Sequence, residues 1–453
     1  MSDSNERRLP VELSVRQRYI VLVAAFLGWM FAGLEISLFV LIHRPAMVTL
    51  MKDTSAPTAS TRPAEIDESA VAQWFARYQA AFMLGAASGG WICGVLGDRR
   101  GRTRALGQSV ICYSLFTGAS YFASSPVELL VLRFLACHGI GGAWPNAVAL
   151  VAEAWPDVSR PFLAGLLGTA ANVGQVLIGV TGLWFDVTPD SWRWVLLVGG
   201  SPIIIGIWCL SGVPESVRWL MSRENVSANA AGPIRELCQP SLRWRLFMGI
   251  LLGAVPVIGT SANSQWIIPW SDQVAAQQRA EVKLGADGKP APRAKADPKS
   301  KARTLVARAS GAVFGSLLGG ILATLLGRRT TYFLISLLSL ITSTVIFGTM
   351  HPLDPWFYQA SFVFGLVGVI YFGWLPLYLP ELFPTRVRAT GTGISFNSGR
   401  AIAAVVVLSA VPFVKMFGGD YAKIGLWTGS IYAVGMVIIL FAPRTDGSSQ
   451  KVA

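Results

Sequence analysis

The sequence predicts an all-α, polytopic membrane protein with twelve transmembrane helices in two pseudo-symmetric six-helix bundles. Three observations support this prediction. Apolar residues make up 53% of the 453 residues, and only 14% are charged. The apolar residues form runs of about 20, which is the length a helix needs to cross a hydrocarbon core of roughly 30 Å. Two residue patterns also recur at nearly the same spacing in the two halves of the chain.

Twelve apolar runs follow one another along the chain. The predicted spans are 19–42, 71–95, 105–124, 128–153, 161–185, 192–213, 245–270, 304–326, 330–350, 356–380, 389–413 and 422–442. The first run is of spanning length and lacks a convincing small-residue cleavage site, so we expect it to stay as an anchor. Four cysteines lie in spans (Cys93, Cys112, Cys137 and Cys209) and Cys238 lies between the halves, a distribution that favours packing over a disulfide framework.

The distribution of lysine and arginine predicts that both termini face the cytoplasm. In that orientation the cytoplasmic segments hold 20 cations, the external segments 14, and four lie within spans. Eight external cations belong to the polar segment 272–303, and long loops follow the charge rule poorly. Without that segment the split is 20 to 6. The net charge of +13 therefore lies in membrane-edge loops beside anionic lipid headgroups, and nucleic acid is not an expected partner.

Two patterns repeat between the halves. Their members are Gly94, Leu96, Gly101 and Arg102, which recur 226 positions later as Gly320, Leu322, Gly327 and Arg328, and Glu153, Pro156 and Arg160, which recur 228 positions later as Glu381, Pro384 and Arg388. Because both offsets agree, the halves are expected to be a duplicated unit. This predicts an N-terminal bundle (1–213), a cytoplasmic linker (214–244) and a C-terminal bundle (245–453) with a long external loop (272–303).

Four motifs resemble signatures of the major facilitator superfamily. The segments are GVLGDRRGRTRAL (94–106) after the second helix, RFLACHGIGGAWP (133–145) in the fourth, PESVRWL (214–220) after the sixth and PELFPTRVRATGTG (380–393) after the tenth. They occur in the expected order and extend over nearly the whole chain. The last three are similar to the sugar-porter and metabolite:proton symporter branches. The resemblance implies secondary active transport by alternating access, with a substrate site between the halves.

Two further segments are similar to the branch that carries small carboxylates with protons. These are GWMFAGLE (28–35) and FNSGR (396–400). That branch usually has two acids in the first helix, where this chain has Ala32 and Glu35, and often an acid in the fourth, where it has Ala143. The departures indicate either reduced coupling machinery or a neighbouring branch. The implied partners are a small organic anion and protons, for a protein that functions as a monomer without a cofactor.

The charged loop 94–106 predicts a latch between the bundles. The cytoplasmic ends of two rocking bundles must separate and rejoin, and partly buried ion pairs made in one state can bias that equilibrium by a few kcal/mol. Asp98 and Arg102 are the expected latch, whereas the other arginines of the loop are expected to set topology. The second loop has Thr324 in place of Asp98. The remaining predicted gating residues are Glu153, Arg160, Glu215, Arg218, Glu381 and Arg388.

Charged residues inside the spans are few, and each needs a reason because a charge near the bilayer centre costs a few kcal/mol. Glu35 is the carboxylate farthest inside a span. Burial favours the neutral form of a carboxyl group, which makes Glu35 the candidate for proton coupling. A structural ion pair with a nearby arginine is the alternative. Arg133 is implied by the fourth-helix resemblance as a coupling or gating arginine.

Two other intramembrane arginines are candidate substrate ligands. Arg400 lies near the middle of its span, where a cation must meet an anion, either a substrate carboxylate or a fixed partner. Arg77 lies two turns into its span, where it either faces a cavity and binds a carboxylate or extends outward to the interface. Two cavity-facing cations would favour anions, and two snorkelled or protein-paired cations would favour sugars.

Neutral polar residues in the spans form a second group of candidates. The predicted substrate-binding residues of this kind are Asn172, Gln175, Asn263, Gln265, Tyr371 and Asn397. Polar residues in membrane bundles more often join helices to one another, and the pair at 263 and 265 could belong to an interfacial aromatic belt with Trp266 and Trp270. His138 beside Gly139 is expected to pack between close helices.

Nothing in the sequence supports catalysis, so the protein is not expected to be an enzyme. No metal-ligand spacing, nucleophile with a neighbouring base, or Walker-type phosphate loop is evident, and the last absence argues against ATP-driven transport. The sequence favours proton-coupled symport of a small carboxylate in the cell membrane. The alternatives are a hexose carrier, in which the neutral polar residues bind hydroxyls, a drug antiporter, and a transporter-like sensor that moves nothing.

Overall fold

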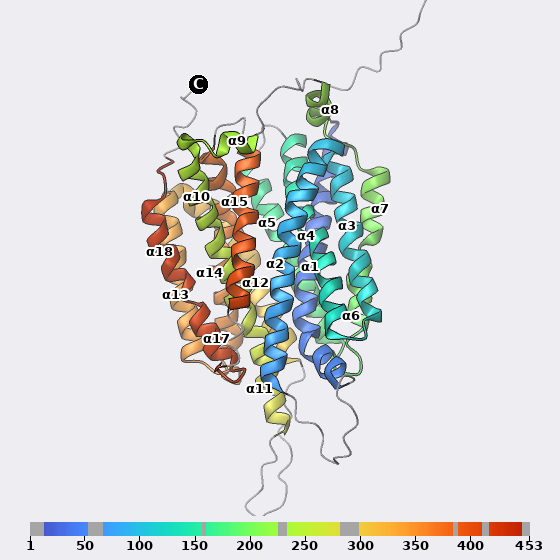
Figure 1. Cartoon of the computed structure of the whole chain (residues 1–453), viewed down its shortest axis with the longest axis vertical. Helices are drawn as coiled ribbons and strands as arrows, with labels where there is room; N and C mark the ends of the chain where they lie inside the picture. Colours follow the sequence, from blue (N-terminus) through green and yellow to red (C-terminus); the bar gives the residue numbers. More distant parts are fainter. Residues whose placement is uncertain are drawn as a thin grey trace, which may run out of the picture.

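The computed structural model describes residues 13–52, 67–155, 160–224, 233–280, 299–383, 388–409 and 416–445. Within these residues the chain forms helices and contains no strand. Figure 1 shows them standing side by side in two groups, the N-terminal bundle (α1 to α7) and the C-terminal bundle (α10 to α18). The short helices α8 (Val217–Glu224) and α9 (Pro233–Leu237) cap one end, which we call the linker end.

In the described part of the chain, each bundle contains six membrane-length segments. In the N-terminal bundle they are α1 (Val15–Lys52), α2 (Glu68–Arg100), α3 (Arg102–Ala119), α4 (Pro126–Ala154), α5 (Arg160–Trp184) and the pair α6 (Trp194–Gly200) and α7 (Ile203–Gly212), with the 3-10 turn η1 (Ser120–Phe122) after α3.

The C-terminal bundle has the same plan. Its segments are α10 (Pro240–Ile258) continued by η2 (Gly259–Asn263), η3 (Ser264–Trp266) and α11 (Ile267–Ala280); α12 (Ser300–Leu325); α13 (Arg328–Gly348); α14 (Phe357–Glu381); α15 (Arg388–Ser409); and the pair α17 (Tyr421–Thr428) and α18 (Ile431–Phe441). Ten of the twelve segments are apolar enough to cross a membrane by length and composition, and the more polar α3 and α15 lie among them.

Two predicted boundaries are wrong in the same direction. The first span was expected to end at 42, but α1 runs to Lys52, and its last turns include the buried Met47 and Leu50. The predicted external loop 272–303 is helical at both ends, because α11 continues to Ala280 and α12 begins at Ser300, while 281–298 lies outside the described residues. Hydropathy finds the part of a helix that lipid would surround, and neighbouring helices bury the remaining turns.

The repeated loop motif has the same backbone in both halves. Gly101 separates α2 from α3 with φ 111°, and Gly327 separates α12 from α13 with φ 83°. Residues with a Cβ rarely adopt such angles, so glycine is required at these sharp turns. The structure thus explains one repeated residue pair: each glycine ends one helix and starts the next at the linker end of its bundle.

The bundles meet along two seams, α2 against α15 and α5 against α12. In the first seam, Gly90 lies directly against the Asn397 side chain. At the end opposite the linker, the bundles also meet through the rings of Phe75 and Trp266, whose centroids are 4.7 Å apart. There the buried Lys301 ammonium donates a 2.9 Å hydrogen bond to the Val187 carbonyl. The bundles are therefore closed against each other at that end.

Candidate functional site

The N-terminal bundle holds a fully buried ion pair. Arg133 of α4 and Glu35 of α1 have side chains that are each 3% exposed, and Arg133 Nη1 lies 3.1 Å from Glu35 Oε1. The same nitrogen donates to the Glu35 carbonyl at 3.2 Å, and the guanidinium lies over the Phe39 ring, 4.7 Å from its centroid. Glu35 is therefore in the ion pair that the sequence left open as its alternative role.

One oxygen of that pair, Glu35 Oε2, is buried outside the arginine contact, and the Thr117 hydroxyl of α3 interacts with this carboxyl group. Among the described residues the geometry of Glu35 Oε2 meets no standard hydrogen bond, and neither does that of the Ser114 and Thr117 hydroxyls. Gly199 of α6 lies against both the Thr117 side chain and Glu35 Oε2. A buried carboxylate with one oxygen held by arginine and the other free can accept a proton at the free oxygen, with hydroxyl groups beside it.

The C-terminal bundle contains a buried arginine that the sequence analysis did not select. Arg308 of α12 is 3% exposed; its Nη2 donates to Gln175 Oε1 of α5 at 2.7 Å, and its Nη1 donates to Ser264 Oγ at 3.5 Å. Its Nε has no partner among the described residues. The sequence does show Arg308 as a cation eight residues into an apolar helix. Arg77 shows the same pattern but is exposed, so the pattern does not identify a buried arginine.

Arg400 of α15 is the second buried arginine of this bundle. It is 7% exposed and lies over the Phe396 ring, 4.8 Å from the centroid. The titratable neighbours that interact electrostatically with the two arginines are neutral groups: the Cys137 thiol of α4 beside Arg400 and the Tyr432 phenol beside Arg308. Within the described residues neither guanidinium has a carboxylate partner. Burying such a charge unpaired costs several kcal/mol, so this pair of sites is suited to an anion.

Polar residues of α5 reach across the seam to α12. Asn172 Nδ2 donates to the Ala312 carbonyl at 3.4 Å, and Gln175 Nε2 donates to Asn172 Oδ1 at 3.3 Å. With the Gln175 bond to Arg308, these contacts form a polar chain between the bundles. On the other seam, Asn397 bonds to the Gly393 carbonyl of its own helix at 3.0 Å and contacts α2 at Gly90. The structure thus brings three of the predicted neutral ligands to the seams.

Other predicted substrate ligands lie elsewhere. Arg77 is exposed and stacks on the Trp74 ring at 4.6 Å, so of the two positions that the sequence left open its side chain takes the one that extends outward and not the substrate-binding one. Asn263 is fully buried and joins η2 to α17 and α13 through the Gly425 carbonyl (2.6 Å) and Ser343 (3.1 Å). Tyr371 is buried in the C-terminal core, where it donates to Ser336 at 2.7 Å.

Two further residues singled out by the sequence, Gln265 and His138, lie in different surroundings. Gln265 is 7% exposed, next to Ser264 in η3, and its Oε1 has no partner among the described residues. His138 lies between α2 and α4, where its Nδ1 is 3.0 Å from Ser88 Oγ. Its backbone also packs against Gly89, as expected for close helices. Gln265 is therefore available to a ligand, and His138 has a packing position.

The repeated motifs form equivalent ion pairs at the linker ends of both bundles. Arg102 Nε lies 3.4 Å from Glu153 Oε1, and Arg328 Nη2 lies 2.8 Å from Glu381 Oε1. All four side chains are about one-fifth exposed, at 17%, 23%, 21% and 21%. Thr445 adds a 2.6 Å hydrogen bond to Glu381 Oε2. The sequence offsets of 226 and 228 thus correspond to one structural device built twice.

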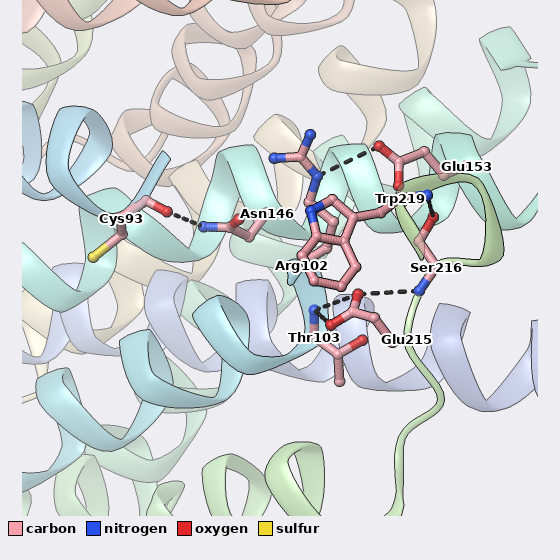
Figure 2. A network of polar contacts seen from close by, with 8 residues as sticks. All are labelled: Cys93, Arg102, Thr103, Asn146, Glu153, Glu215, Ser216 and Trp219. Atoms are coloured by element: carbon pink, nitrogen blue, oxygen red, sulfur yellow. Dashed lines mark hydrogen bonds and ion pairs between the residues drawn. The ribbon is translucent and has the colours of Figure 1, made fainter. Parts of the chain in front are cut away.

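The linker bonds to Thr103, the residue after Arg102 of the first pair, as Figure 2 shows. Glu215 accepts a hydrogen bond from the Thr103 amide at 3.1 Å, in the first turn of α3, and one from the neighbouring Ser216 amide of the linker at 3.0 Å. The Thr103 hydroxyl donates to the Pro214 carbonyl at 3.0 Å. The PESVRWL segment therefore holds the start of α3. The side chains of Asp98, Arg160, Arg218 and Arg388 lie outside the described residues.

The two-bundle arrangement, with buried charges beside the seams and paired charges at one end, defines a class of membrane protein. The profile of the Major Facilitator Superfamily matches residues 19–408. The chain therefore belongs to this superfamily. Among solved structures, a D-xylose-proton symporter has the same fold, with a TM-score of 0.68 and 17% identity over 95% of this chain and 99% of that one.

Two relatives are more similar to the chain in sequence than this symporter is. The chain is 28% identical over 365 residues to a "Probable 4-methylmuconolactone transporter" of Cupriavidus pinatubonensis, covering 80% of this chain and 79% of the relative. It is 26% identical over 383 residues to the "Cis,cis-muconate transport protein" of Acinetobacter baylyi, covering 82% and 85%. Both alignments include most of each chain, so the similarity concerns the whole two-bundle unit.

Proposed function

We propose that the protein is a secondary active transporter that carries a small organic anion inward together with one or more protons by alternating access. The observation that carries the proposal is the absence of any carboxylate partner, within the described residues, for the buried guanidinium groups of Arg308 and Arg400. A carboxylate ligand would neutralise them with charge-assisted hydrogen bonds, which a neutral sugar cannot do.

The names of the relatives support a small organic anion as the substrate. One is named for muconate, an organic anion, and another for a methylated muconolactone. In the proposal, Arg308 and Arg400 bind the anion from the C-terminal bundle, while Gln175 of α5 holds Arg308 and Asn172 bonds to Gln175. Gln265 and Asn397 supply further neutral contacts. Because these residues belong to both bundles, the bound anion would join the bundles and favour a closed state.

Proton coupling is assigned to the N-terminal bundle. Glu35 Oε2 would take up the proton, and the neighbouring Arg133 would respond to the loss of the negative charge. A protonated Glu35 no longer neutralises Arg133, so the charge balance inside the bundle changes with each proton that binds or leaves. That change is the physical link between proton movement and the rocking of the bundles.

The charged residues at the linker end are assigned to gating. Breaking and remaking the Arg102–Glu153 and Arg328–Glu381 pairs would bias the two states, with Glu215 holding α3 in place and Asp98, Arg160, Arg218 and Arg388 as further candidates. The linker end faces the cytoplasm in the proposed orientation, and the protein works as a monomer in the cell membrane, in contact with lipid. The proposal requires neither a cofactor nor a reaction on the substrate.

The test uses purified protein in vesicles subjected to a pH step. External proton uptake is recorded while cis,cis-muconate, other carboxylates or hexoses are added. We expect proton uptake with carboxylates and none with hexoses. Proton movement with a hexose alone would overturn the proposal in favour of a sugar symporter. An absence of movement with every compound, in protein that binds carboxylates, would favour a sensor.

A further inference from the structure

We infer that the transported anion is a dicarboxylate and that Arg308 and Arg400 each bind one of its two carboxylates. This inference rests on the proposed function and specifies its substrate class. Its starting point is the number of uncompensated charges. A single carboxylate can neutralise one guanidinium and leaves the other buried without a counter-ion. A ligand with two carboxylates compensates both.

The two arginines belong to different seams. Arg308 is on α12, whose seam partner is α5, and its Nη2 is bound to Gln175 of that helix. Arg400 is on α15, whose seam partner is α2, and it interacts electrostatically with the Cys137 thiol of α4. One bidentate carboxylate bound at a single arginine would therefore leave a charge at the other seam. Two carboxylates at opposite ends of one molecule fit this division.

Each arginine also has capacity for a ligand. Guanidinium groups carry five N–H donors and favour paired hydrogen bonds to a carboxylate. Arg308 uses its donors on the neutral oxygens of Gln175 and Ser264, and its buried Nε has no partner in the described part of the chain. The nearby Tyr432 hydroxyl is likewise buried without a partner there. Neutral acceptors satisfy hydrogen bonds but leave the charge in place, so a carboxylate would be the stronger partner.

The region near Arg400 is suited to the hydrocarbon part of such a ligand. Its guanidinium covers the Phe396 ring, and Phe396 also contacts Phe372 with ring centroids 6.4 Å apart. Across the interface, Gly90 of α2 and Cys137 of α4 contribute no charge. The recognition elements are thus two cations with apolar and neutral polar groups beside them, which matches a short carbon chain that ends in two carboxylates.

The test compares cis,cis-muconate with its monomethyl ester, which keeps the carbon skeleton and removes one negative charge. Dissociation constants are measured on the full-length protein in lipid nanodiscs at pH 7, where free carboxyl groups are ionised. Direct binding avoids the passive leak of monoacids across vesicles. We expect the ester to bind about 10- to 100-fold more weakly, the range for losing a hydrogen-bonded charged group.

Variants of the two arginines test whether each arginine binds one of the two carboxylates. Arg308→Gln and Arg400→Gln should each weaken muconate binding by about 10- to 100-fold while changing ester binding by less than about threefold, because the remaining arginine still binds one carboxylate. The double variant should lose the ester too. Arg77→Gln is the matched control, since it removes an exposed arginine that stacks on Trp74. Arg308→Lys and Arg400→Lys keep the charge and show whether each site folds with a cation.

The outcomes separate this inference from the function on which it rests. Equal affinities for muconate and its ester in the unaltered protein would overturn the dicarboxylate assignment and leave organic-anion symport standing. Loss of ester binding in one single variant, with the other unaffected, would also overturn it, because one arginine would then bind the only carboxylate recognised. Binding of hexoses and of neither anion would overturn both proposals.

Discussion

The two bundles share a fold and a repeated loop, yet they treat buried arginine in opposite ways. In the N-terminal bundle, Arg133 is neutralised at 3.1 Å by Glu35, an acid supplied by the same bundle. In the C-terminal bundle, Arg308 and Arg400 have only neutral partners among the described residues. In the proposed function this difference is a division of labour. An arginine with its own carboxylate responds when that carboxylate gains a proton, whereas one without a carboxylate can bind an anion from outside the protein.

The largest expected effect comes from making the N-terminal bundle resemble the C-terminal one. Glu35→Gln removes the carboxylate that pairs with Arg133, so we expect uptake driven by a pH gradient to fall at least about 100-fold, because an amide cannot carry the proton. Exchange of internal for external substrate needs no net proton movement and should stay within about threefold. Both are measured with labelled anion in vesicles.

This variant leaves Arg133 buried and unpaired, which can destabilise the protein by about 3–5 kcal/mol. The double variant Glu35→Gln with Arg133→Gln restores neutrality and serves as the control for folding. If pH-driven uptake survives in a well-folded Glu35→Gln protein, proton coupling lies elsewhere and the division of labour is incorrect.

The converse experiment makes the C-terminal bundle resemble the N-terminal one. Gln175→Glu places a carboxylate where an amide oxygen now accepts a 2.7 Å hydrogen bond from Arg308. The new ion pair competes with the substrate, so we expect binding of the organic anion to weaken about 10- to 30-fold, as for the loss of one charge-assisted contact. The dissociation constant is measured by titration in nanodiscs.

Gln175→Ala is the matched control, because it removes the amide without adding a charge. It should weaken binding by no more than about threefold, since a neutral hydrogen bond contributes only about 0.5–1.5 kcal/mol and here binds the arginine rather than the anion. Equal effects of the two substitutions would mean that charge is not what Arg308 contributes.

A smaller effect should separate the two gating pairs. Glu381 accepts from both Arg328 and Thr445, whereas Glu153 has the longer 3.4 Å contact with Arg102. Partly exposed pairs are each worth about 0–1 kcal/mol, so Glu153→Gln and Glu381→Gln should change the transport rate by about two- to fivefold. The effect of Glu381→Gln should be the greater.

The rate change should come from the conformational equilibrium and not from substrate affinity. Cysteine cross-linking between the linker ends of the bundles reports that equilibrium, and Thr445→Ala provides an intermediate variant that keeps the ion pair. Identical rates for the original protein and both glutamine variants would show that these pairs only support the loops.

The smallest effect is expected for Arg77, an exposed residue away from the proposed anion site. Arg77→Gln removes an exposed guanidinium that stacks on Trp74, so transport and affinity should stay within about twofold. The measurement is the initial rate of anion uptake at matched protein levels. A large loss of affinity would place Arg77 in the substrate path in another conformation of the transport cycle.

The duplicated loops illustrate which features of the molecule could be predicted from the sequence. Offsets of 226 and 228 predicted that Arg102 and Glu153 have counterparts in Arg328 and Glu381, and both pairs are ion pairs in the structure. The positive φ at Gly101 and Gly327 gives the physical reason for the repeated glycine. Short motifs of this kind are local, so a sequence pattern captures them.

The candidate site could be predicted less completely from the sequence. The sequence selected Glu35, Arg133 and Arg400, and all three are buried. It also selected Asn263, which proves to join helices, and it passed over Arg308. A polar residue in an apolar span satisfies its hydrogen bonds either with neighbouring helices or with a ligand, and composition is the same in both cases.

Hydropathy determined that this chain crosses a membrane as helices, because backbone groups in lipid must be satisfied within helices of fixed minimum length, and the repeated motifs divided those helices into two sets. Arg77 and Arg308 show what only the tertiary structure decided. Arg77 is the tenth residue of α2 and Arg308 the ninth of α12, and each is the only arginine within its predicted span, 71–95 or 304–326. Arg77 is exposed and Arg308 is buried against α5. A helix that is apolar all round carries no amphipathic signal to fix its rotation, so the packing of its neighbours determines which charge faces the interior.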